Sequence, residues 1–430
     1  MTSDLMEKVV SLCKRRGFVY PGSEIYGGLA NTWDYGPLGV ELKNNIRDFW
    51  WKTFIHGREE MFGIDGSIIS HPRVWEASGH VENFKEPLVE CKSCHKRFKA
   101  ENATSNKCPE CKGELTEEKM FNGLFKTFLG ATEDSSSIAY LRPETAQAIF
   151  INYKNILDSF HPKLPFGIGQ IGRSFRNEVT AGNFIFRDLE FDQMEIEYFI
   201  DPQSDWQKYF DQWQEEMKKW LVAVTGAPEA KISIREHGDK ERSHYSKKTV
   251  DIEYEYPFGK KEVWGLAYRT DFDLAQHQKF SGVNLQYRTE DGRDFIPHVI
   301  EPSFGMPRTL LITLLEAYKE EDKRVVLKLN PKLSPYKVAV FPLLANKPEL
   351  VKVARQIFDM LRPELRTAWD DRGNIGKRYL SQDEIGTPWC ITVDFQTLED
   401  NTVTVRDRDI TKQERVGIDK LIEYFQNKMK

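Results

Sequence analysis

The chain has 430 residues, which is long enough for two or three domains with their own hydrophobic cores. Charged residues make up 30% and apolar residues 40% of it, a balance typical of globular enzymes, and 12% aromatic residues argue against disorder. The net charge of −5 argues against a generally basic nucleic-acid coat protein, although a local basic patch could still bind RNA.

The N-terminal segment, residues 1–16, has the pattern of an amphipathic helix in which acidic and basic residues are mixed. It lacks the apolar core of a signal peptide, and no apolar run approaches the length of a membrane span. We therefore expect a cytoplasmic protein that does not contact a membrane.

A long helix is expected over residues 37–56, because its first residue is a proline and proline is tolerated in the first helical turn. Trp50, Trp51 and Phe54 suggest a large apolar surface near its end. An apolar strand is predicted over residues 64–70.

Four of the six cysteines form two Cys-x-x-Cys pairs, which are Cys91 with Cys94 and Cys108 with Cys111. Two such pairs can place four thiolates tetrahedrally around one Zn²⁺. Two disulfides or free thiols are the alternatives, and disulfides are disfavoured without a secretory signal. Because four thiolates close the site, we predict a structural Zn²⁺ in an insertion over residues 88–115, with His95 on the surface.

Helices and antiparallel strands are predicted to follow up to about residue 330. The helices are expected over residues 143–157, 206–224 and 305–318, and the strands over residues 138–141, 172–178, 186–195, 248–256, 262–270 and 296–303. The aromatic stripe of the helix over 206–224 is more typical of a core than of a ligand site. This order predicts an α+β domain over residues 1–330, not a regular β-α-β alternation.

The hairpin formed by the segments 172–178 and 186–195 is the most informative feature of the chain. Side chains alternate along a strand, so charged groups of this hairpin are expected to share faces. These are Arg176 and Glu178 on the first strand, and Arg187, Phe191 and Glu195 on the second. Arginines for phosphate, a carboxylate for an amine and a ring for a base would suit a nucleotide. A solvated sheet face with paired charges is the alternative.

Polar residues also gather at the ends of other expected strands. They are Arg142 with Glu144, Glu262, Arg269, and Glu301 with Ser303. Arg308 falls in the first turn of the helix over 305–318, where a cation opposes the helix dipole. An anionic ligand such as a phosphate would explain that position.

After a linker over residues 328–335, the pattern changes to a compact α/β domain over residues 335–430. Its strands are predicted over residues 338–341, 365–368, 388–394 and 402–406, and its helices over residues 347–362 and 412–427.

Together these motifs resemble those of class II aminoacyl-tRNA synthetases, and in particular the homodimeric glycyl type, over nearly the whole chain. Residues 175–178 with Phe191 are similar to motif 2 of that class, Gly305 with Arg308 to motif 3, and residues 37–72 to motif 1, the dimer element. More specific matches lie at residues 33–39, 74–80, 142–147 and 301–305, and at residues 371–379 in the anticodon-binding domain.

The resemblance implies that glycine is activated by ATP and then transferred to tRNA-Gly. Arg176 would hold the α-phosphate, Arg308 the γ-phosphate and Glu178 the adenine amino group, so that catalysis rests on positioning and charge stabilisation. The ATP-binding residues implied in this way are Arg176, Asn177, Glu178, Phe186, Arg187, Phe191, Glu262, Val263, Gly305 and Arg308.

The resemblance also implies a glycine site in which three carboxylates surround the ammonium group, Ser303 limits the space at Cα and Arg269 faces the carboxylate. Glu262 and Glu301 would approach the Mg²⁺ that accompanies ATP. The residues implied for glycine are Glu144, Phe191, Gln193, Glu195, Arg269, Glu301, Ser303 and Gly305, with Lys99 as a further contact.

Three positions depart from the family pattern: Pro307 and Ala148 stand where glycine is usual, and Lys99 stands where arginine is common. Two alternatives remain open. Another class II synthetase of the same subgroup would share motifs 2 and 3, whereas a non-catalytic nucleic-acid-binding relative should lack Arg176 or Arg308. Both arginines are present.

Overall fold

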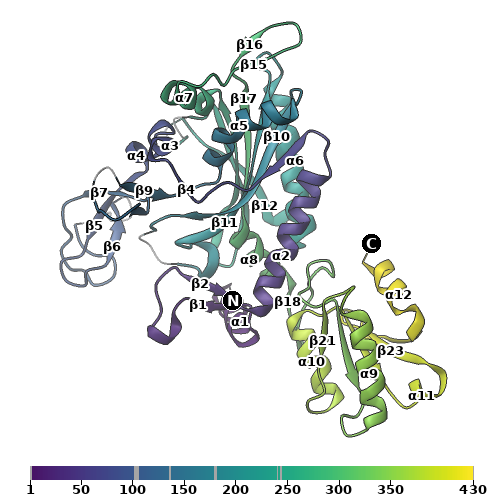
Figure 1. The fold of residues 1–430 in the computed structure, drawn as a ribbon. Coiled ribbons are helices and arrows are strands. Elements are labelled where there is room, and N and C mark those ends of the chain that lie inside the picture. Colours follow the sequence, from purple (N-terminus) through teal and green to yellow (C-terminus); the bar gives the residue numbers. More distant parts are fainter. Residues whose placement is uncertain are drawn as a thin grey trace.

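The computed structural model describes residues 2–100, 106–134, 137–178, 182–239, 241–242 and 245–429. A seven-stranded sheet with helices on both faces forms the larger part of the molecule, and a smaller α/β part follows it (Figure 1). Residues 101–105 of the predicted cysteine insertion lie outside the described residues, as do Met1 and Lys430.

The central sheet has the strand order β12-β13-β14-β17-β11-β10-β3. Neighbouring strands are antiparallel, except that β10 and β3 pair in parallel at one edge. The strands are β3 (Met61–Ile64), β10 (Phe166–Phe175), β11 (Glu190–Ile200), β12 (Ile232–Glu236), β13 (Lys248–Tyr256), β14 (Gly259–Thr270) and β17 (His298–Gly305). This mixed, mainly antiparallel sheet confirms the predicted α+β class.

The two faces of the sheet differ, and strand β11 shows why. Met194 and Ile196 point to an apolar face that the main hydrophobic core fills, whereas Gln193, Glu195 and Glu197 point to the opposite face. The apolar face is covered by α1 (Thr2–Arg16), α2 (Pro37–Trp51), α6 (Trp206–Thr225) and α8 (Met306–Ala317), and α5 (Ala146–Phe160) and α7 (Phe272–Ser281) lie on the other side.

The aromatic stripe of α6 is buried in the main core, as predicted from its spacing. Helix α2 forms as predicted and continues as a π-helical turn, Lys52–His56. The large apolar surface expected at Trp50, Trp51 and Phe54 is not found, because Trp50 and Phe54 are buried in the main core. Helix α5 begins at Ala146, three residues after Pro143. No helix in the described part of the chain is both long and apolar enough to cross a membrane.

Shorter strands build the periphery. They are β1 (Val19–Pro21) with β2 (Trp33–Tyr35); β4 (Ile69–Ser70), β8 (Lys126–Phe128) and β9 (Ile138–Leu141); β5 (Lys85–Glu90), β6 (Arg97–Lys99) and β7 (Lys119–Asn122); β15 (Tyr287–Arg288) with β16 (Asp294–Phe295); and β18 (Tyr318–Glu321) with β19 (Arg324–Leu327). Helices α3 (Pro72–Ala77) and α4 (His80–Asn83) precede β5.

The prediction of one strand over residues 64–70 is wrong. Strand β3 ends at Ile64 and β4, in another sheet, begins at Ile69. Between them Gly66 passes so close to helix α5 that a Cβ there would lie 2.6 Å from the Ala148 Cβ. Residues 64–70 therefore contribute to strands in two different sheets.

The C-terminal part contains a five-stranded sheet in the order β21-β20-β22-β23-β24. Helices α9 and α12 pack on one face, and α10 on the other. The elements are β20 (Val338–Pro342), α9 (Pro348–Leu361), β21 (Thr367–Trp369), α10 (Ile375–Ile385), β22 (Trp389–Val393), α11 (Thr397–Asp400), β23 (Thr402–Asp407), β24 (Gln413–Gly417) and α12 (Leu421–Lys428).

Two predictions fail in this part. The helix expected over residues 412–427 is strand β24, a short 3₁₀ turn (Ile418–Lys420) and α12, because residues 413–417 pair with β23. Helix α10 was not predicted, because its many polar residues obscure the spacing of the apolar residues that contact β20 and β22.

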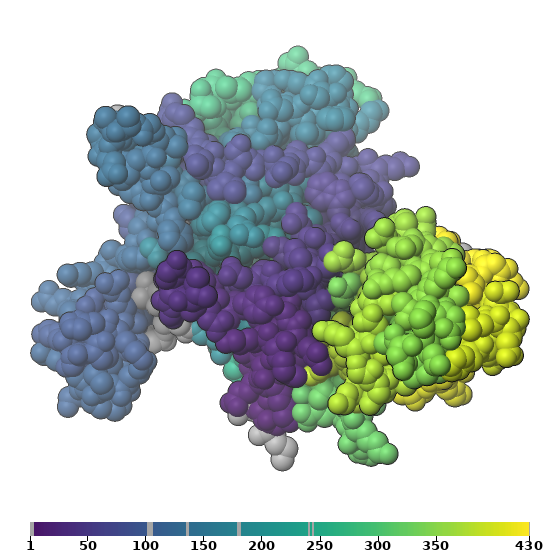
Figure 2. All heavy atoms as spheres, turned by 60° about the horizontal axis from the view of Figure 1, so that its bottom comes forward, coloured from purple at the N-terminus to yellow at the C-terminus, as the bar shows by residue number. Residues whose placement is uncertain are grey.

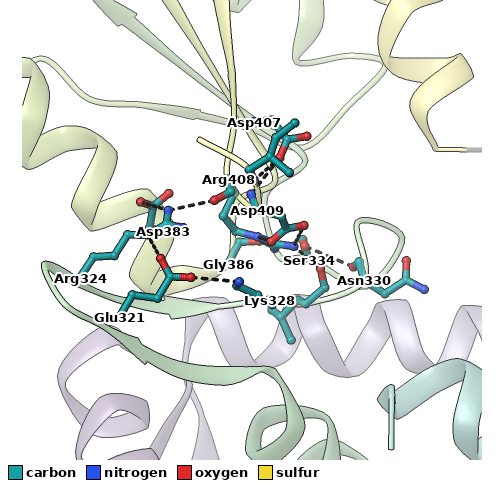
Figure 3. A network of polar contacts seen from close by, with 12 residues as sticks. Glu321, Arg324, Lys328, Asn330, Ser334, Asp383, Gly386, Asp407, Arg408 and Asp409 are labelled. Atoms are coloured by element: carbon teal, nitrogen blue, oxygen red, sulfur yellow. Dashed lines mark hydrogen bonds and ion pairs between the residues drawn. The ribbon is translucent and has the colours of Figure 1, made fainter. Parts of the chain in front are cut away.

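A buried ion network joins the two parts of the molecule (Figure 3). Asp383 on α10 is fully buried and accepts two hydrogen bonds from Arg406, at 2.8 and 2.9 Å, and one of 2.7 Å from Arg324 on β19. Arg408 donates at 2.8 Å to the Leu329 carbonyl. Charges from both parts therefore share one network.

The N-terminal helix takes part in the same contact. Arg15 and Arg16 on α1 form ion pairs with Glu384, the residue after Asp383. In the space-filling view, the purple N-terminal segment lies directly beside the green and yellow C-terminal part (Figure 2).

Replacing Asp383 by alanine should lower the free energy of unfolding by about 3 kcal/mol, because it strands buried guanidinium groups. Asp294→Ala is the control: it removes an exposed partner of Arg288 and should leave the free energy of unfolding nearly unchanged. Urea denaturation measures both. Equal, small effects would mean that the network contributes little to stability.

Candidate active site

A cavity of about 250 Å³ opens on the face of the central sheet that carries Gln193 and Ser303. Every residue predicted to bind ATP lines it except Asn177, and Gln193 and Ser303 from the predicted glycine site line it as well. The predicted ATP contacts in its wall are Arg176, Glu178, Phe186, Arg187, Phe191, Glu262, Val263, Gly305 and Arg308.

The backbone around this cavity differs from the predicted hairpin. Strand β10 ends at Phe175, so Arg176 and Glu178 lie beyond it and do not share a strand face. Arg187 likewise precedes β11. The chain does reverse near Asn183, whose φ is 61°, but it then forms a short 3₁₀ turn, Phe184–Phe186. Loops, which strand alternation does not govern, therefore present these side chains.

Arg308 lies in the first turn of α8, as predicted. Its Nη1 lies 3.0 Å from the Glu262 Oε2 and donates to the Glu262 carbonyl at 3.2 Å, and its guanidinium lies 4.5 Å from the centre of the Phe186 ring. Burial raises the pKa of Glu262, but the charge and hydrogen bond of Arg308, together with the Arg176 charge, more than offset this and hold that pKa below its usual value. Pro307 fits the first turn, where its missing N–H has no intrahelical partner.

On the opposite wall, the Arg176 Nε donates to the Pro143 carbonyl at 3.0 Å, and its guanidinium lies 5.3 Å from the Phe191 ring centre. Two guanidinium groups and an aromatic ring thus surround one polar cavity. Such a wall can bind a polyanion that carries a flat base.

A second group of side chains, which we call the carboxylate cage, lies on the same face of the sheet and consists of Glu144, Glu195 and Glu301. Glu195 accepts hydrogen bonds from the Thr145 Oγ1 at 2.5 Å and from the Gln193 Nε2 at 2.7 Å. Gln193 also reaches the Ser303 Oγ at 2.8 Å. Because Gln193 and Ser303 line the cavity, the cage adjoins it directly.

Glu144 is held by His80, whose Nε2 lies 3.2 Å away, and by the Gln147 Nε2 at 3.0 Å. Burial raises the pKa of Glu144, but the contacts with His80, the Arg269 charge and the Gln147 hydrogen bond together outweigh it and keep the pKa far below its usual value. Glu144 is therefore an ionised group in the cage.

Arg269 is bound by neighbouring carboxylates. It is only 1% exposed, donates to both Asp273 oxygens at 2.7 and 2.8 Å, and donates to the Glu301 Oε1 at 2.7 Å. Its guanidinium also lies 3.9 Å from the Tyr245 ring centre. In this arrangement Arg269 orders Glu301, and its contact with the glycine carboxylate remains a prediction.

Two further predicted contacts lie elsewhere. Lys99 is on β6, in the small sheet beside the cysteines, where it pairs with Glu86, and it does not line the cavity. Glu301, proposed as a Mg²⁺ ligand, does not line the cavity either, and one of its oxygens is taken by Arg269. Of the two predicted Mg²⁺ ligands, Glu262 lines the cavity.

The four cysteine sulfurs lie within 4.8 Å of one another. Cys91 and Cys111 are 3.4 Å apart and Cys94 and Cys108 are 3.8 Å apart, close to the about 3.8 Å expected between thiolates at 2.3 Å from one Zn²⁺. The Cys94 N–H donates to the Cys91 sulfur, and this lowers the Cys91 pKa to about 6. The donor set therefore fits zinc.

Comparison with known proteins agrees with this geometry. Residues 130–318 match the tRNA synthetase class II core domain (G, H, P, S and T), and residues 337–428 match an anticodon binding domain. The glycine–tRNA ligase of Alkaliphilus metalliredigens is 48% identical, over 100% of this chain and 99% of that protein. Those of Thermobifida fusca (49%, over 99% and 98%) and Treponema denticola (48%, over 99% and 97%) are similarly alike.

The chain belongs to the glycine–tRNA ligase family. This confirms the resemblance drawn from motifs 2 and 3. It rules out the alternative that the chain belongs to another class II synthetase family of the same subgroup. The residue roles within the site remain predictions.

Sequence reasoning about this ligase missed several residues that the fold brings to the site. His80 and Gln147 lie within the family-specific segments 74–80 and 142–147, and their place in these segments could have identified them. Asp273 follows Arg269 by four residues, but Arg269 lies on strand β14 and Asp273 on helix α7, so helical spacing could not have identified the pair. Asp188 and Glu197 carried no such signal.

Asp188 lines the cavity, and burial raises its pKa to about 8. The folded carboxyl therefore keeps a proton that the unfolded chain releases near about pH 4, so this group lowers wild-type stability as the pH rises from about 5 to 8. Asp188→Asn should become progressively more stable than the wild type over that range in thermal melts. Asp294→Asn, at an exposed carboxyl with a lowered pKa, should differ by a constant amount. Parallel curves for Asp188→Asn would contradict the prediction.

Proposed function

We propose that this chain attaches glycine to tRNA-Gly in two steps, through a glycyl-adenylate made from glycine and ATP. One observation carries the proposal: a cavity walled by Arg176, Arg308 and Phe191 adjoins a buried carboxylate cage, with Gln193 between them. The first part suits a nucleotide and the second an ammonium group, and family membership agrees with both.

For ATP, Arg176 would hold the α-phosphate, where charge develops as the glycine carboxylate attacks, and Arg308 the γ-phosphate. Phe191 would face the adenine ring, and Glu178 would accept from its amino group. Arg187, which lies 3.8 Å from Glu178, would add charge near the phosphates. No protein nucleophile is required, because the substrate carboxylate attacks phosphorus directly.

Mg²⁺ would neutralise the phosphates when it is bound with ATP. Glu262 is suited to hold it, because its carboxylate lines the cavity and its pKa is lowered. Arg308, paired with the same carboxylate, would then lie close to the phosphate and metal charges.

For glycine, the carboxylate cage would bind the ammonium group, with Ser303 as the limit at Cα. A larger side chain would clash with this wall, and rejection by clash does not demand a separate editing site. The zinc site would be structural, because four cysteines leave no position for a substrate.

The C-terminal part would bind the anticodon region of the tRNA, and two copies of the chain would form a homodimer in the cytoplasm.

ATP–pyrophosphate exchange tests the function directly, with each amino acid offered alone. We expect exchange with glycine, and Arg308→Ala should lower kcat/KM by about 100-fold or more, the usual effect of losing one charge-stabilising donor. Arg288→Ala, at an exposed hairpin, is the control and should leave exchange unchanged.

Exchange with serine, proline, histidine or threonine instead would overturn the glycine assignment. No exchange with any amino acid, from folded protein that still binds tRNA, would favour a non-catalytic accessory role.

Zinc analysis of the purified protein should find about one ion per chain, held by four thiolates. Cys94→Ser should lose the metal, whereas Cys390→Ser, at a buried thiol outside the cluster, should retain it. Folded protein that was prepared with zinc and contains none would favour free thiols.

A further inference from the structure

Glu197 on β11 is a buried carboxyl group that the proposed mechanism does not use. Its side chain is 0% exposed, and neither of its oxygens has a hydrogen-bond partner among the described residues. An ionised carboxylate without water or donors is strongly disfavoured, so such a group normally retains a proton.

The strand register places this group against the carboxylate cage. The pairs Glu195 with Ser303 and Tyr198 with Ile300 put Glu197 directly across from Glu301. One oxygen each of Glu195, Glu197 and Glu301 lies within 4.8 Å of the other two. Carboxylates this close cannot all be ionised, since like charges across a strand pair repel.

The hydrogen bonds show which carboxyl lacks support. Arg269 donates to Glu301 at 2.7 Å, and Thr145 and Gln193 donate to Glu195. These hydrogen bonds favour the ionised states of Glu195 and Glu301, although burial still raises the pKa of both groups, that of Glu301 well above its usual value. Glu197 receives no such donor within the described residues.

The surroundings of Glu197 agree with a neutral group. The charged side chains that act on it are Glu301 on β17, Glu195 on β11, Arg269 on β14 and Asp273 on α7, and β10 opposes it with the apolar Ile168. Burial raises its pKa well above the usual value, the Glu301 charge raises it further, and Arg269 opposes the rise.

We propose that Glu197 is a positioning residue that stays protonated and, through its neutral carboxyl group, holds Glu301 in place for the glycine ammonium. The proposal rests on the proposed function, in which Glu301 belongs to the carboxylate cage. A second ionised carboxylate across from Glu301 would repel it and compete for Arg269. A protonated one can instead donate to it.

Glutamine and leucine at position 197 separate this role from the alternatives. Glutamine keeps the shape and a hydrogen-bond donor without a titratable proton, whereas leucine keeps only the bulk. The measurement is glycine-dependent ATP–pyrophosphate exchange, with KM for glycine, KM for ATP and kcat determined separately.

We expect Glu197→Leu to raise the KM for glycine about 10- to 100-fold, the effect of losing one buried hydrogen bond to a charged group, with the KM for ATP unchanged. Glu197→Gln should recover most of that loss, to within about threefold of the wild type. A general folding defect would raise neither KM selectively, so this split distinguishes positioning from a structural role.

The pH profile gives a second readout that does not depend on the leucine variant folding. If Glu197 is neutral, kcat/KM for glycine in Glu197→Gln should follow the wild type from about pH 6 to 8, because no charge has been removed. A loss of kcat/KM in Glu197→Gln across this range would overturn the proposal, since it would mean that an ionised Glu197 binds the ammonium.

A leucine variant with the wild-type KM for glycine would also overturn it. If the wild type itself shows no glycine-dependent exchange, the proposed function fails. If the wild type exchanges and the variants depart from the expected pattern, only the role of Glu197 fails.

Discussion

Charge buried on one face of the central sheet is the constraint on which the rest of this structure depends. Strand β11 directs Met194 and Ile196 into the main core and Gln193, Glu195 and Glu197 to the other side. The apolar half anchors the sheet to the helices, so the polar half is held rigidly. Buried carboxylates are tolerated there only because donors such as Arg269 and Thr145 compensate them, and a bound ammonium group would complete that compensation. Fold and site therefore arise from the same alternation.

The cavity and the carboxylate cage form one continuous site. Gln193 bonds to the cage and lines the cavity, and a single residue thus joins the region suited to a nucleotide to the region suited to an ammonium group. Helix α8 extends this continuity, because it begins beside Arg308 and ends where the β18–β19 hairpin carries Arg324 to the C-terminal part. Helix α8 and this hairpin thus connect the cavity with the contact between the two parts of the molecule.

One electrostatic rule explains why some buried carboxyl groups stabilise the fold while others have raised pKa values: a buried charge needs hydrogen-bond partners. Asp383 is fully buried, yet two arginines satisfy it, so it stabilises the contact between the two parts. Glu197 is as deeply buried and Asp188 nearly so, but each has an oxygen without a partner among the described residues, and burial raises the pKa of each. Groups of the second kind lie at the cavity and the cage, where substrate charges would change their balance.

Local patterns in the sequence determined the elements whose contacts repeat at short range. Three features could be predicted from the sequence: the aromatic stripe of α6, the spacing of the four cysteines, and the cluster of arginines, glutamates and one aromatic ring. Helical period, metal geometry and charge complementarity are local properties, so they leave a pattern in the sequence. Only the tertiary structure decided that the run over 64–70 divides between two sheets, that residues 413–417 form a strand and that Lys99 lies away from the cavity. It also decided that Arg269 binds Asp273 and Glu301 and that Glu197 faces Glu301. These outcomes depend on which distant strands pair and which charges they bring together, and desolvation, not sequence spacing, sets the state of each group once it is buried.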